Sequence, residues 1–158
     1  MGLDIVAGIK GLSERVRAIN ALLMPVLQSR QIKAKPQSGG KITNPLESYR
    51  LLKTESEALL AHQFTKDFES SPLILEALRG NTEEIEKLPD ESINLVLEFV
   101  SLLTTIYARK STSQEEPLNL QKAYHSKSTQ YSLVGYLISH QIEERKRSKE
   151  TIKLQEVS

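Results

Sequence analysis

The most informative part of the sequence is residues 88–109, which read LPDESINLVLEFVSLLTTIYAR. Its opening residues, Leu88-Pro89-Asp90-Glu91, are typical of a helix start. The apolar residues that follow recur with the 3.6-residue period of an α-helix: Ile93, Val96, Leu97, Val100, Leu103 and Tyr107. This is the most apolar segment of the chain, and we expect it to be the central helix.

Two helices are predicted before it. Apolar residues from Leu12 to Val26 recur at spacings of four and three, which predicts a long amphipathic helix. Gly8 and Gly11 weaken its first turns, so the helix should begin properly at Ser13 or bend there. Asn44-Pro45-Leu46-Glu47 supplies a cap, a proline and a carboxylate, and predicts a second helix running to about Phe64 or Phe68.

Shorter elements surround the central helix. Ser71-Pro72 and Gly80 bound a short helix, and residues 82–87 can form one acidic turn. A last helical region starts at Pro117, and an interruption near 126–128 is left open. One apolar stripe continues through its second half: Tyr131, Val134, Ile138 and Ile142.

The expected fold is all-α. Aromatic residues make up 5% of the 158 residues and tryptophan is absent, so the core must consist mainly of Leu, Ile, Val and Ala. No alternation of polar and apolar residues indicates a strand. We therefore predict a single domain over residues 1–158, a compact helical bundle of about five or six helices.

Composition also bounds the cellular setting. The chain has no cysteine, which excludes disulfides and thiolate zinc sites. The sequence shows no signal peptide and no apolar run approaching a membrane span, so a cytoplasmic protein without a membrane partner is expected. The abrupt apolar start resembles a domain cut from a longer chain.

Charge is distributed unevenly along the chain. Residues 1–60 carry nine Lys/Arg against five Asp/Glu, residues 61–100 three against nine, and residues 101–158 nine against six. The net charge of +1 therefore hides parts of +4, −6 and +3. Such segregation can create opposed faces, one suited to a polyanion and the other to a basic protein surface.

A basic loop is predicted at residues 29–44, which contain one proline, paired glycines and four cations. Together with neighbouring cations it could displace counterions from a nucleic-acid backbone. The candidate nucleic-acid-binding residues are Arg15, Arg17, Arg30, Lys33, Lys35, Lys41, Arg50, Lys53, Arg145, Lys146, Arg147 and Lys149. An ordinary solvated surface is the alternative, favoured for the terminal four. No aromatic interleaving is expected among these cations, so base stacking is not predicted.

Catalytic and metal-binding patterns are missing from the sequence. His62, His125 and His140 lie far apart, and no two have the i, i+4 spacing of a helical metal site. Ser38-Gly39-Gly40-Lys41 matches Ser-x-x-Lys but sits in the predicted loop, without a helix to fix its geometry. We expect no catalytic residues, no metal and no cofactor, and hence a protein that is not an enzyme.

The outline of the chain resembles the small subunits of CRISPR interference complexes, which are helical bundles with a long basic loop and cationic helix faces. More narrowly, it is similar to the C-terminal helical domain of a type I-D large subunit, which can also be made separately from an internal start. The beginning Met1-Gly2-Leu3-Asp4-Ile5-Val6 suits that origin. The resemblance covers the full length in architecture and rests on no short motif.

The resemblance implies a non-catalytic subunit present in several copies. Its partners would be other subunits, further copies of itself, and the backbone of guide RNA, target DNA or both. Another hypothesis is a protein-only adaptor or regulator, antitoxin-like or chaperone-like, whose apolar helix 89–109 docks a partner. An enzyme with an unseen site is the third alternative.

Overall fold

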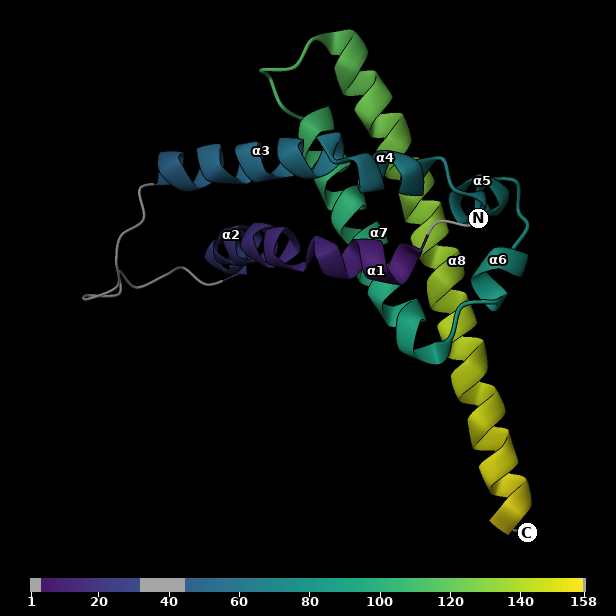
Figure 1. Ribbon diagram of the computed structural model, residues 1–158. Helices are drawn as coiled ribbons and strands as arrows, with labels where there is room; N and C mark the ends of the chain where they lie inside the picture. The colour runs from purple at the N-terminus through teal and green to yellow at the C-terminus, as the bar shows by residue number, and fades with distance from the viewer. Residues whose placement is uncertain (1–3, 32–44, 158) are drawn as a thin grey trace, which may run out of the picture. The chain divides into compact units, whose positions relative to one another are not determined.

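The computed structural model describes residues 4–31 and 45–157, with side chains over residues 4–23 and 47–154. All regular structure in these ranges is helical, which confirms the all-α prediction. The helices are α1 (Ile5–Gly11), α2 (Ser13–Gln31), α3 (Pro45–Ala61), α4 (Gln63–Glu69), α5 (Pro72–Leu78), α6 (Glu83–Glu86), α7 (Asp90–Ser111) and α8 (Leu118–Val157) (Figure 1).

The prediction of five or six helices was too low. The break before Ser13 was expected, but a second break at His62 divides the helix predicted to run from Pro45 to Phe64 or Phe68 into α3 and α4. There the N–H of His62 bonds to the Leu59 carbonyl three residues back, at 3.2 Å. The His62 ring Nδ1 then accepts the Phe64 N–H at 3.1 Å, which satisfies a free donor at the start of α4.

The chain divides into two compact units, residues 10–66 and residues 1–9 with 67–158. We name them the α2–α3 unit and the α7–α8 unit after their longest helices. The single domain expected over 1–158 stays a prediction.

Helix α7 is the core helix of the α7–α8 unit, as predicted. Of its predicted stripe, only Leu97 is half-buried, and the other five residues are buried. Phe99 adds an edge-to-face contact with Phe68, at 5.1 Å between ring centroids. Each fully buried large side chain stabilises the fold by roughly 1.5–3 kcal/mol, so this face contributes substantially to the stability of the unit.

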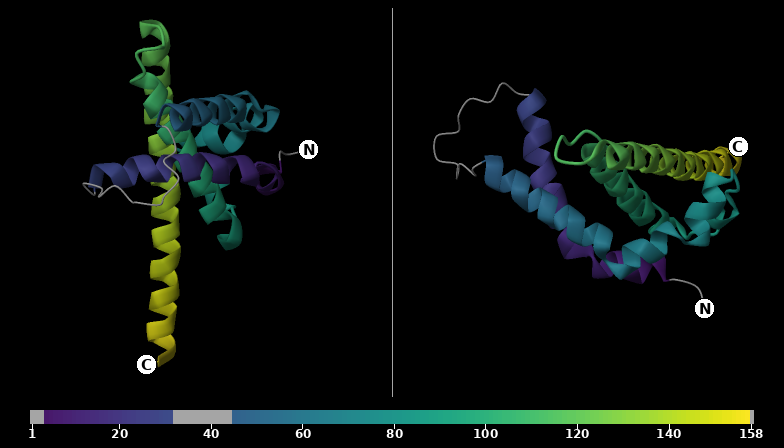
Figure 2. Two further views of the ribbon diagram at one scale, coloured as in Figure 1. Left: turned by 90° about the vertical axis from the view of Figure 1, so that its left-hand side faces the viewer. Right: turned by 90° about the horizontal axis from the view of Figure 1, so that it is seen from above.

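Helices α7 and α8 pack side by side and run antiparallel (Figures 1 and 2). The interruption left open near 126–128 does not occur, because α8 is continuous from Leu118 to Val157. Ser128 donates to the Thr104 carbonyl of α7 at 3.2 Å, and Lys127 pairs with Glu69 at 2.9 Å. These contacts outweigh the weak helix propensity of the serines. The end of α8, yellow in both figures, runs on past the start of α7.

Three tyrosines form a stack within the same unit. The Tyr107 ring lies 5.9 Å from Tyr124 and 5.8 Å from Tyr131 between centroids. The Tyr107 hydroxyl donates to Glu69, whose other oxygen accepts from Lys127. Burial, and then the Glu69 carboxylate, raise the pKa of Tyr107 and of Tyr131. Both phenols therefore stay protonated and neutral.

Helix α5 ends at Leu78, just before Gly80, as predicted from the sequence. Gly80 adopts a φ of 89°, which a residue with a Cβ rarely takes. Its N–H bonds to the Ala77 carbonyl and the Asn81 N–H bonds to the Glu76 carbonyl, both near 3.0 Å. This Schellman arrangement satisfies the last carbonyls of α5.

The α2–α3 unit is built on two helices that pack together. Ile19 and Leu23 of α2 and Leu52 and Leu59 of α3 are buried. Helix α2 extends to Gln31, so the predicted loop 29–44 begins with three helical residues. The rest of that loop, 32–44, lies outside the described residues.

One helix among the described residues, α7, is long and apolar enough to cross a membrane by length and composition alone. This differs from the expectation that no apolar run approaches a membrane span. The core helix of a non-membrane protein passes the same test, and nine residues of α7 are buried.

Candidate nucleic-acid interface

The division of the chain into two units coincides with a division of charge. The α2–α3 unit holds ten Lys/Arg against four Asp/Glu, for a net charge of +6. The α7–α8 unit holds eleven against sixteen, for a net charge of −5. The basic part of the sequence is therefore a structural unit of its own, built on α2 and α3.

Four predicted site residues are described on α2 and α3, and they differ in availability. Arg15 is held by Glu55 of the same unit, at 2.8 Å between Nη1 and Oε2. Lys53 is exposed but already interacts with a neighbour. Arg17 and Arg50 are exposed and form no ion pair with any residue in the described ranges. Among the side chains of α2 and α3 that the structure describes, these two arginines are the cations without an ion-pair partner.

Four other predicted site residues belong to this unit by sequence. Arg30 lies in the last turn of α2, but its side chain is outside the described part of the chain. Lys33, Lys35 and Lys41 are outside it entirely. All four contribute to the net charge of +6.

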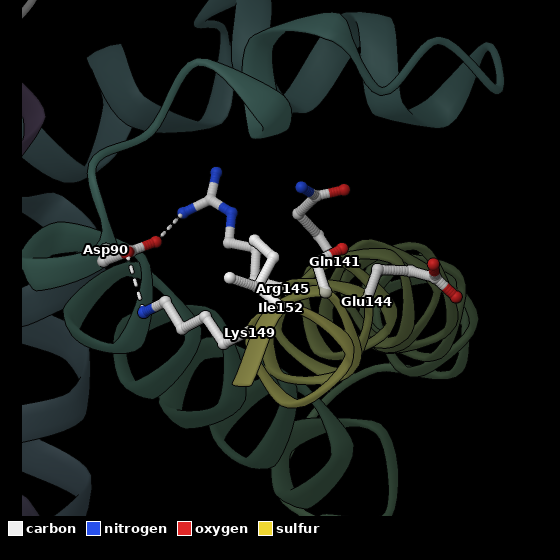
Figure 3. A pocket seen from close by; sticks show the side chains of 7 residues that line it. Asp90, Gln141, Glu144, Arg145, Lys149 and Ile152 are labelled. Atoms are coloured by element: carbon white, nitrogen blue, oxygen red, sulfur yellow. Dashed lines mark hydrogen bonds and ion pairs between the residues drawn. The ribbon is translucent and has the colours of Figure 1, made fainter. Parts of the chain in front are cut away.

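The predicted cluster at residues 145–149 of α8 is bound to carboxylates of its own unit. Arg145 Nη1 lies 2.8 Å from Asp90 Oδ1 and Lys149 Nζ lies 3.1 Å from Asp90 Oδ2 (Figure 3). Arg145 also donates to the Glu86 carbonyl at 3.0 Å. These contacts fasten α8 to the start of α7. The hydrogen bonds from Lys149 and then Arg145 hold the pKa of Asp90 below its usual value.

The remaining two cations of that cluster have partners on their own helix. Lys146 lies 3.8 Å from Glu143, and Arg147 lies 3.6 Å from Glu144. Both pairs are exposed and three residues apart, so each is weak. Every cation of the cluster still has a carboxylate neighbour, which lowers the positive potential that this segment of α8 can offer to a phosphate.

The sequence contained a signal for the Asp90 contacts. Arg145 and Lys149 are four residues apart and continue the spacing of the apolar stripe of α8, in which Ile138 is buried and Ile142 half-buried. That face of α8 packs on α7, so both cations point toward its acidic start. The stripe was identified from the sequence, but it was not followed into the charged segment.

A hollow beside these contacts is lined by polar side chains and one apolar residue: Asp90, Gln141, Glu144, Arg145, Ser148, Lys149 and Ile152 (Figure 3). Its two cations are already paired with Asp90. In the part of the chain that the structure describes, no group of three His, Cys, Asp or Glu residues could hold a metal. The hollow has the features of a structural junction.

Each of the three histidines has its own local surroundings. His62 caps α4 through its ring. His140 stacks on Tyr136, at 6.4 Å between centroids, and lies 3.8 Å from Glu144. His125 is exposed on α8.

One residue near the basic cations was overlooked. Tyr49 of α3 directly precedes Arg50, and its side chain is exposed. This differs from the expectation that no aromatic residue interleaves with the cations.

Comparisons with known proteins found no match among family models, curated proteins or solved structures.

Proposed function

We propose that the chain is a non-catalytic subunit of a multi-subunit RNA-guided complex of the CRISPR type, which holds a nucleic-acid backbone through its α2–α3 unit. The observation that supports this proposal is the net charge of +6 confined to residues 10–66. Phosphate binding releases counterions and needs several free cations on one body, with no exact placement of any one.

The state of the individual cations supports the same assignment. Arg17 and Arg50 are exposed and form no ion pair with a described residue, so a phosphate can bind them without displacing a carboxylate. At residues 145–149 a phosphate must compete with Asp90, Glu143 or Glu144. The α2–α3 unit is therefore the better candidate for the interface.

The α7–α8 unit suits protein contacts. Its net charge of −5 repels a polyanion and favours a basic protein surface, such as a neighbouring subunit or another copy. Exposed carboxylates at Glu83, Glu86 and Glu91 lie around the start of α7. Such a complex would work in the cytoplasm.

The adaptor hypothesis is less well supported. It requires the apolar face of α7 to dock a partner, but Ile93, Val96, Val100 and Leu103 of that face are between 0 and 2% exposed. Binding through this face would require the unit to open. Each of these side chains exposed to water would cost about 1.5–3 kcal/mol.

A salt titration tests backbone binding. Fluorescence anisotropy of labelled RNA and DNA should show the affinity of the parent protein falling steeply with salt. The double variant Arg17→Ala/Arg50→Ala should bind more weakly. The slope of log affinity against log salt concentration, called the salt slope below, should become flatter by up to about 0.7 to 0.9 per lost phosphate contact. The matched control is Lys146→Ala/Arg147→Ala, which also removes two exposed helical cations and should leave the slope unchanged.

Two results would contradict the proposal. Absence of salt-dependent binding by the parent protein at low salt would exclude a backbone-binding role. Equal losses of nucleic-acid affinity in the two double variants would show that binding depends only on the net charge of the chain. The RNA-guided complex itself is tested by purifying the native assembly: guide RNA and further subunits should accompany the chain, and isolation without either would refute that part.

A further inference from the structure

Tyr49 differs from the other four tyrosines of the chain. Tyr107 and Tyr131 are buried, Tyr124 stacks on Tyr107, and Tyr136 stacks on His140. Tyr49 is 46% exposed and makes no ring contact with any residue that the structure describes. It is therefore the one tyrosine within the described ranges whose ring has no such partner.

The position of Tyr49 places this ring beside cations. Arg50 follows it directly, and Lys53 lies four residues on, which puts its side chain on the same side of α3 as Tyr49. The buried side of the helix carries Leu52, Ser56 and Leu59 instead. The exposed part of α3 thus combines an aromatic ring with Arg50, which has no ion-pair partner in the described ranges, and with Lys53, which already interacts with a neighbour.

A ring and cations together favour one class of nucleic acid. Phosphates bind cations in both single strands and duplexes, but only an unpaired base can lay its face on an aromatic side chain. We infer that α3 binds single-stranded nucleic acid, with an unpaired base stacked on Tyr49 and Arg50 on the adjacent phosphate. This inference rests on the proposed backbone-binding function and names the form of its ligand.

Single-residue variants separate stacking from charge. The probes are a labelled single strand of about 16 nucleotides, made as RNA and as DNA, and the duplex of the same sequence. Tyr49→Ala should weaken single-strand binding about 5- to 10-fold, toward the lower end of base-stacking effects, and leave duplex binding and the salt slope unchanged. Tyr49→Phe keeps an aromatic ring and should bind like the parent, whereas Tyr49→Leu should behave like Tyr49→Ala.

The matched control is Tyr136→Ala, on α8 of the acidic unit. Tyr136 is 68% exposed, more than Tyr49, yet its removal should leave binding to every probe unchanged. Comparing the affinities for the RNA strand and the DNA strand shows which nucleic acid is preferred, because a contact to the 2′-hydroxyl would favour RNA.

The failures of the inference and of the proposed function are distinguishable. If the parent binds with a steep salt slope but Tyr49→Ala matches it on single strands, stacking is refuted and backbone binding stands. Full binding by Tyr49→Leu would refute stacking in the same way, since an apolar side chain would then suffice. If no probe binds with salt dependence, both are refuted.

Discussion

The α2–α3 unit and α8 each carry a group of cations, but the two groups are in different electrostatic states. On α8, Arg145 and Lys149 are held by Asp90, and the neighbouring cations lie beside Glu143 and Glu144. On α2 and α3, Arg17 and Arg50 have no ion-pair partner in the described ranges. A run of basic residues in a sequence therefore does not by itself define a phosphate-binding surface. The carboxylates within reach of each cation decide how much positive potential remains.

The largest effect is expected from a charge placed inside the α7–α8 unit. Val100 is fully buried on α7, and Val100→Asp would leave a carboxylate without water or a partner. This should destabilise the unit by about 4 kcal/mol or more and abolish its folded state. Urea unfolding followed by circular dichroism measures the loss. An unchanged unfolding midpoint in urea would mean that the buried apolar face of α7 does not stabilise this unit.

A smaller effect of opposite sign is expected at Gly135 in α8. An added Cβ would lie 3.7 Å from Val100 Cγ1 and 4.0 Å from Leu97 Cδ1, which are ordinary contacts. Gly135→Ala should stabilise the unit by about 0.5–1 kcal/mol, because glycine is costly inside a helix. Gly80→Ala is the control and should destabilise, since its φ of 89° strains any side chain. Destabilisation by Gly135→Ala would show that α7 and α8 pack more tightly than described.

Much of this fold could be predicted from the sequence because its helices carry local signals. Pro45 and Pro72 start helices, Gly80 ends one, and the 3.6-residue period identifies the buried face of α7. The break at His62 could not be predicted, because it depends on a ring nitrogen accepting one backbone N–H. Continuity of α8 through Ser128 was equally hidden, since it depends on a contact with Thr104 far away in the sequence.

The candidate site was less accessible to sequence reasoning. The charge segregation was visible in the sequence. Counting charges over residues 1–60, 61–100 and 101–158, however, placed Lys66 with the acidic part and combined the end of α7 with α8. The pairing of Arg145 and Lys149 with Asp90 joins residues more than 50 positions apart. Tyr49 beside Arg50 was readable from the sequence, but the exposure of its ring was not.

The smallest stability effect is expected from Asp90→Asn. The pKa of the Asp90 carboxyl is lowered from 3.8 by Lys149 and Arg145, so its stabilising contribution is present above that pH and is lost as pH falls through the folded value. The variant lacks this contribution at every pH. The difference in Tm between parent and variant should therefore shrink as the pH is lowered below 3.8.

The same variant sharpens the comparison between the two cation groups. Without the Asp90 charge, Arg145 and Lys149 lose their carboxylate partner, so Asp90→Asn should bind nucleic acid more tightly at low salt and with a steeper slope. Unchanged binding would mean that pairing with Asp90 is not what keeps α8 from binding phosphate.

Two quadruple alanine variants test whether the α2–α3 unit, and not α8, binds the nucleic-acid backbone. Each removes four cations and changes the net charge of the chain from +1 to −3. One variant replaces Arg30, Lys33, Lys35 and Lys41; the other replaces Arg145, Lys146, Arg147 and Lys149. Circular dichroism first establishes that both remain helical, and anisotropy then gives affinity against salt. The first variant should bind more weakly, with a slope flatter by up to about 0.7 to 0.9 per lost contact, while the second should retain the parent slope. Loss of binding in the second variant with full binding in the first would contradict binding through the α2–α3 unit.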